Sequence, residues 1–103
     1  MREAAYQARI IKTLYDLFPG CVIIKNDPEY LQGIPDLIIL FGRSWAMLEV
    51  KASRHAPNRP NQDYYIDMLG EMSFAAFIYP ENEEEVLHAL QCAFESERNA
   101  RIP

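Results

Sequence analysis

The sequence has few cysteines and no long apolar run, and both features narrow the class of protein. Its only cysteines, Cys21 and Cys92, each lie among apolar neighbours. We expect two buried free thiols rather than one disulfide, which is typical of a reducing cytoplasm. No segment approaches the roughly 18–20 apolar residues that span a bilayer, and the N-terminus lacks the apolar block of a signal peptide. We therefore expect no membrane partner.

The chain also lacks internal repeats, low-complexity tracts and long linkers. Half of its 103 residues are apolar, a composition that suits one compact unit with a modest hydrophobic core. We therefore expect a single domain over residues 1–103.

Positive charge is scarce, and the net charge of −5 does not by itself suggest nucleic-acid binding. The distribution is uneven, however. Residues 1–62 hold eight Lys and Arg against six Asp and Glu, whereas residues 63–103 hold two against nine. One part of the surface could therefore face phosphates while the acidic C-terminal part faces away.

Apolar periodicity predicts seven elements in the order αβββαβα. The predicted helices cover 2–18, 60–72 and a segment that starts near 82, and the predicted strands cover 21–25, 36–41, 45–52 and 74–79. The short turn at 42–44 predicts an antiparallel hairpin. The crossover helix predicts that the third and fourth strands are parallel. The expected fold class is α/β, with helices flanking a mixed four-stranded sheet.

Three charged residues lie in or beside the strongly apolar strands, where charge is costly to bury. Side chains alternate along a strand, so Glu49 and Lys51 share one face. Pairing through the hairpin turn sets Asp36 near-opposite Glu49, with Cβ atoms roughly 4.5–5.5 Å apart. Two carboxylates this close repel unless one is protonated or a cation lies between them. Mg²⁺ or Mn²⁺ fits such an oxygen-rich site.

Helical periodicity places two further polar side chains, Glu3 and Gln62, on the inward faces of their helices. Each charged or polar residue also has a plainer interpretation. Glu3 could complement a helix N-terminus, and Gln62 could belong to a capping box. Glu49 and Lys51 could form a solvated edge-strand pair, and Asp36 could be a turn residue after Pro35.

The pattern "GIPD", followed thirteen residues later by "EVK", resembles the PD-(D/E)XK nuclease superfamily. Within it, the chain is similar to the small stand-alone VRR-NUC type of phages and bacteria. The resemblance is strengthened by Lys25-Asn26 at the end of the first strand, by "RPNQ" before the second helix and by the element order. The resemblance covers nearly the whole chain and implies a restriction-endonuclease-like core. It also implies a protein that acts in the cytoplasm of a bacterial cell or a phage-infected host.

Residue by residue, the resemblance implies a metal site and a catalytic set. The implied metal ligands are Glu3, Asp36, Glu49 and the carbonyl of Val50. Asp36 and Glu49 would also belong to the catalytic set, together with Lys51 as the catalytic lysine and Gln62 bordering the site. Asn61 departs from the family, which often has an acidic residue at this place.

These features predict a Mg²⁺- or Mn²⁺-dependent DNA endonuclease. We expect it to be selective for branched (Holliday-junction-like), flapped or nicked DNA. Four basic residues are available for salt-dependent phosphate contacts, namely Lys25, Arg43, Arg54 and Arg59. Two alternatives stay open: a non-catalytic nucleic-acid-binding module or accessory subunit that keeps the fold, and an acidic protein that binds a basic partner.

The helix predicted over 60–72 carries a second apolar strip, Tyr64, Met68 and Met72, beside its inward face. Exposed Tyr and Met are typical of protein interfaces, and cutting both strands of a branched DNA calls for two sites. We therefore expect a homodimer with Tyr64 and Met68 in its interface. The alternative is that the strip packs under the C-terminal helix of the same chain.

Overall fold

The structure is a computed structural model that describes residues 2–100. It confirms the predicted order of elements, with strand and helix ends shifted slightly from the sequence-based bounds. The elements are α1 (Glu3–Leu17), β1 (Val22–Lys25), β2 (Leu37–Phe41), β3 (Ser44–Val50), α2 (Gln62–Met72), β4 (Phe74–Ile78) and α3 (Glu83–Ala100). The helix predicted from residue 60 begins at Gln62, after Asn61 in a left-handed conformation.

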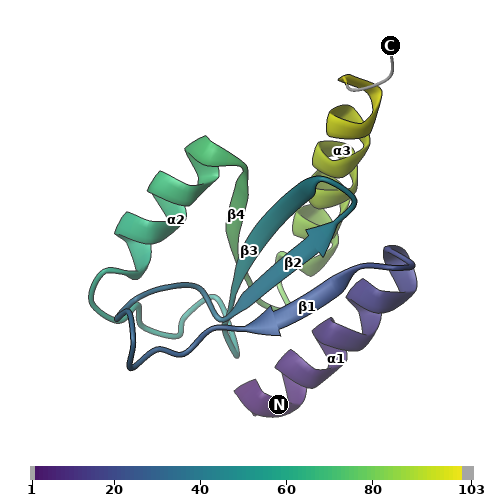
Figure 1. Cartoon of the computed structure of the whole chain (residues 1–103). Helices are drawn as coiled ribbons and strands as arrows, with labels where there is room; N and C mark the ends of the chain where they lie inside the picture. Colours follow the sequence, from purple (N-terminus) through teal and green to yellow (C-terminus); the bar gives the residue numbers. More distant parts are fainter. Residues whose placement is uncertain (1, 101–103) are drawn as a thin grey trace.

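The four strands form one mixed sheet in the order β1-β2-β3-β4 (Figure 1). β2 pairs antiparallel with β1 and with β3. β3 pairs parallel with β4, as the crossover through α2 predicts. In the β2–β3 hairpin, Leu37 lies opposite Leu48 and Phe41 lies opposite Ser44. This is the register that the sequence predicts.

Helices α1 and α3 lie on one side of the sheet and α2 lies on the other (Figure 1). The main hydrophobic core fills the α1/α3 side, where alternate residues of β2 and β3 are buried. Its largest fully buried side chains include Tyr6, Ile10, Leu14, Leu48 and Leu90. Alternation along β3 sends the other residues of that strand, Glu49 included, to the α2 side.

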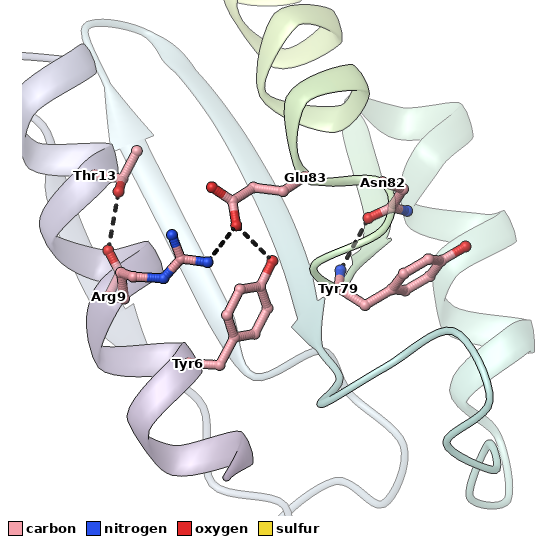
Figure 2. A network of polar contacts seen from close by, with 6 residues as sticks. All are labelled: Tyr6, Arg9, Thr13, Tyr79, Asn82 and Glu83. Carbon is pink, nitrogen blue, oxygen red and sulfur yellow. Dashed lines mark hydrogen bonds and ion pairs between the residues drawn. The ribbon is translucent and has the colours of Figure 1, made fainter. Parts of the chain in front are cut away.

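A polar contact ties α1 to the start of α3 on the core side (Figure 2). The buried Tyr6 donates its hydroxyl hydrogen to Glu83 Oε1 at 3.0 Å, and Arg9 pairs with the same oxygen at 2.9 Å. Burial, followed by the hydrogen bond to Glu83, raises the pKa of Tyr6. The contact satisfies the hydroxyl of a side chain that otherwise lies in the core.

The cysteine prediction is half right. Both thiols are free, and Cys21 is buried. Cys92 is exposed, contrary to the prediction, with its Sγ 3.7 Å from His88 Nε2 on α3. It follows the buried Leu90 by two positions, which corresponds to about 200° around a helix and turns it to the solvent side.

The described part of the chain contains no helix that combines the length and the apolar character needed to cross a membrane.

Candidate active site

The three charged strand residues meet at one end of the sheet. Glu49 and Lys51 lie at the end of β3, and each is only 5 % exposed. Both side chains contact Gln62 of α2, which confirms that they share one sheet face. The intervening Val50 is fully buried in the core on the opposite face.

Asp36 reaches this site from the residue before β2. Its Oδ2 accepts a hydrogen bond of 2.9 Å from the backbone N–H of Val50. One step beyond the Leu37–Leu48 pair, the register brings Asp36 level with Glu49, as the hairpin predicts. The carboxylate is therefore fixed by the backbone of the same strand that carries the other two charged residues.

Gln62 links the acidic and basic parts of the site. Its Nε2 donates to Glu49 Oε2 at 3.0 Å, and its Oε1 accepts from Lys51 Nζ at 2.7 Å. The same Oε1 accepts from the backbone N–H of Arg59 at 2.9 Å, so Gln62 also closes the start of its helix. Gln62 therefore contacts Glu49 and Lys51 and also holds the turn before its helix, whereas the N-cap residue Asn61 makes no side-chain capping bond. The role of Gln62 in catalysis stays a prediction.

Lys51 is held in place by two acceptors. Its Nζ donates to Gln62 Oε1 and, at 2.9 Å, to the carbonyl oxygen of Pro57. The same Nζ lies 5.6 Å from the centre of the Phe77 ring. An ammonium group has three N–H donors. Within the described residues, these two hydrogen bonds leave one donor for a ligand.

A cavity of about 430 Å³ opens onto these side chains. Segments 28–36 and 56–62 form its walls, with Glu3 at the N-terminal end of α1 also on its lining. Gly33 touches the second segment so closely that an added Cβ would come within 2.6 Å of Asn61 Cβ and 2.8 Å of the Pro60 carbonyl oxygen. The two loops therefore fix each other, and with them the shape of the cavity.

One oxygen in the site lacks a partner. Glu49 Oε1 is buried and, within the described residues, receives no hydrogen bond. Burial, then the charge of Asp36, then the hydrogen bond that a protonated Glu49 makes with Asp36 raise the pKa of Glu49 to about 8, while Lys51 opposes this shift. A buried carboxylate oxygen without a partner is costly unless a proton or a cation compensates it.

The donor set fits a hard divalent cation in part. Asp36 and Glu49 supply carboxylate oxygens, and one of these is the partnerless Glu49 Oε1. Glu3 lines the cavity together with Asp36 and Glu49, although it is exposed rather than buried. Across the described chain, no three His, Cys, Asp or Glu side chains gather closely enough to form a metal cluster. If Asp36 and Glu49 held Mg²⁺, water or phosphate would supply the remaining ligands, as is usual for this ion.

The four basic residues singled out from the sequence do not gather in one place. All are exposed, and Arg59 lines the site cavity. Arg54 lines a neighbouring cavity of about 400 Å³ that also borders Lys51. Lys25 ends β1 opposite the core residue Leu37, which puts it on the other sheet face from Glu49. Arg43 lies in the hairpin turn, at the opposite end of the sheet from Asp36. Their contacts with phosphate stay predictions.

Two residues that no sequence pattern singled out, Gly33 and Pro57, shape the site through the backbone. Gly33 has a φ of +91°, a conformation that favours glycine. A glycine and a proline in polar loops indicate turns, but nothing in the pattern indicates that these two loops meet.

Comparisons of the chain with protein-family models, with curated proteins and with solved structures found no match.

Proposed function

We propose that this protein is a metal-dependent DNA endonuclease of the PD-(D/E)XK type, with its active site at Asp36, Glu49 and Lys51. The observation that carries the proposal is the partnerless, buried Glu49 Oε1 beside a second carboxylate and a buried lysine, all on one cavity. A cation held by Asp36 and Glu49 would satisfy this oxygen, and a proton shared with Asp36 would do so in the metal-free protein.

Asp36 and Glu49 would hold the cation, and the Val50 carbonyl and Glu3 are proposed as further contributors. When bound, Mg²⁺ or Mn²⁺ would neutralise phosphate charge and lower the pKa of a bound water. Lys51 would donate its remaining N–H to a non-bridging phosphate oxygen, where negative charge grows during hydrolysis. Gln62 would keep Lys51 and Glu49 in this arrangement, and Arg59 would contact a neighbouring phosphate.

A panel of synthetic DNAs tests the proposal. Four-way junction, flapped, nicked and continuous duplexes would be incubated with the protein in Mg²⁺, in Mn²⁺ and in EDTA. We expect metal-dependent cleavage, fastest on branched or nicked DNA. Binding of these DNAs without cleavage in either metal would favour the non-catalytic module instead.

We further propose that the active form is a homodimer. Tyr64 and Met72 of the α2 strip are 61 % and 66 % exposed, and Met68 between them is half-buried. α3 therefore does not cover Tyr64 and Met72 as the alternative required. The sheet face on the α2 side adds Val22, Ile24 and Leu40, which are also exposed. A second copy that covers this apolar surface would supply the second active site needed to cut both strands.

A further inference from the structure

The loop between β1 and β2 displays two apolar side chains to solvent beside the proposed active site. Tyr30 is 87 % exposed and Leu31 is 40 % exposed. Pro28 and Gln32, which flank this pair within two residues, line the site cavity. A single exposed apolar residue is ordinary. An adjacent pair next to a polar cavity is suited to a ligand that has an apolar surface.

Hydrogen bonds within the loop hold this pair in place. Asp27 Oδ1 accepts from the backbone N–H of Glu29 at 2.9 Å, and the Asp27 carbonyl oxygen accepts from Tyr30 N–H at 3.2 Å. The Leu31 carbonyl oxygen accepts from Ile34 N–H at 3.2 Å. With Gly33 packed against Asn61, the loop is organised before any ligand arrives.

The charges of the loop indicate which part of DNA it would meet. Asp27 and Glu29 are exposed carboxylates on either side of Pro28. They would repel a phosphate backbone that ran along the loop. The aromatic face of Tyr30 and the side chain of Leu31 would instead favour the flat, apolar face of a base.

We propose that Tyr30 stacks on a base exposed at a nick or branch point, with Leu31 packed beside it, and that this contact gives the preference for discontinuous DNA. The proposal rests on the proposed nuclease function. In a continuous duplex each base face is covered by its neighbours, so this contact would first require unstacking. At a nick or branch the face is already accessible.

The test compares affinities for a nicked duplex and for the continuous duplex of the same sequence, measured in EDTA so that cleavage does not interfere. The proteins are the wild type, Tyr30→Ala, Tyr30→Phe and the control Tyr15→Ala, which removes another exposed tyrosine, from α1. Alanine substitution of a stacking aromatic costs about 1–3 kcal/mol per base. We therefore expect Tyr30→Ala to lower the affinity for nicked DNA by about 5- to 160-fold and to leave the affinity for the continuous duplex nearly unchanged. Tyr30→Phe and Tyr15→Ala should keep the wild-type preference.

The inference would be overturned by the absence of a wild-type preference for nicked DNA, by an unchanged preference in Tyr30→Ala, or by an equal loss of preference in Tyr30→Phe. A change in molecular mass on Tyr30→Ala without a change in DNA preference would also overturn it, and would make the loop a protein contact.

Cleavage of the same DNAs in Mg²⁺ is measured in parallel. If cleavage persists with equal rates on nicked and continuous DNA, the loop inference fails and the nuclease function stands. If no DNA is cleaved, the nuclease function fails.

Discussion

The ionised form of Glu49 is destabilised in the folded protein, because the side chain is buried beside a second carboxylate. Burial and Asp36 raise its pKa to about 8, far above the ordinary value of 4.5. In the unfolded chain, Glu49 loses its proton near the ordinary value, whereas the folded protein retains it up to about pH 8. The folded metal-free protein should therefore lose stability as the pH rises from about 4.5 to about 8.

The substitution Glu49→Gln tests whether ionisation of Glu49 lowers the stability of the fold. The amide cannot ionise, so the variant should lack this pH-dependent loss and should melt at a higher temperature than the wild type at pH 8. Each kcal/mol gained would raise the Tm by roughly 4–8 °C for a domain near this size. Melting curves in EDTA at pH 5 and pH 8 measure the effect. Parallel pH profiles for the two proteins would contradict the raised pKa.

Lys51 should contribute more to catalytic turnover than to DNA affinity, because its Nζ is held inside the site rather than on the surface. We expect Lys51→Ala to lower single-turnover cleavage by about 100- to 1,000-fold with a much smaller change in affinity. The loss of its hydrogen bonds to Pro57 and Gln62 should also cost about 1–3 kcal/mol of stability. The control is Lys12→Ala, which removes an exposed lysine from α1. A loss of affinity that matches the whole loss of activity would make Lys51 a phosphate anchor.

At the scale of elements, the contact between the two site loops depends on Gly33. Alanine at Gly33 would adopt an unfavourable positive φ and would also overlap Asn61 and Pro60. The matched control is Gly20→Ala, since Gly20 has a φ of +90° but open space where a Cβ would lie. Both variants should lose about 1–2 kcal/mol from the backbone conformation, and Gly33→Ala should lose a further 1–3 kcal/mol or so from overpacking.

Denaturant unfolding of the two glycine variants measures this difference, and a cleavage assay shows its consequence. Gly33→Ala should lose activity, whereas folded Gly20→Ala should keep it. Equal losses of stability and equal activities would mean that the loop contact does not shape the site.

The helices and strands are largely predictable from the sequence, because the hydrophobic periodicity agrees with the Gly and Pro residues that mark turns and helix ends. The hairpin register follows from the short turn at Gly42, and it correctly puts Asp36 level with Glu49. The inward position of Gln62 follows from helical periodicity. Glu3 also borders the cavity, but it stays exposed because a residue in a first turn lies at the edge of the packed layer.

The parts of the site that come from loops are not predictable in the same way. The Pro57 carbonyl binds Lys51 and Gly33 meets Asn61 only because two irregular segments fold over the same sheet end. Loop paths have no periodic signal, so the sequence indicates turns there but not which turns come together. For the same reason, the sequence does not show that the four basic residues lie apart in the structure, namely Lys25, Arg43, Arg54 and Arg59.

At the scale of the whole molecule, α2 leaves part of its own surface and part of the sheet uncovered. If a second copy covers this surface, Met68→Glu should place a charge in the interface and separate the dimer. Light scattering at micromolar concentration should give two chain masses for the wild type and one for the variant. The control Lys12→Glu adds an acidic side chain on α1 and should keep the mass of the wild type. A wild-type mass of one chain, unchanged by Met68→Glu, would mean that the dimer is wrong.

The central claim is that Asp36 and Glu49 hold a divalent cation that supports phosphodiester hydrolysis. The most direct test is single-turnover cleavage of a synthetic nicked duplex or junction in Mg²⁺, with wild type and Glu49→Gln measured side by side. We expect metal-dependent cleavage by the wild type and its loss, by at least about 100-fold, in a Glu49→Gln variant that is folded and still binds the DNA. Cleavage by Glu49→Gln at the wild-type rate, or wild-type cleavage that persists in EDTA, would contradict the claim.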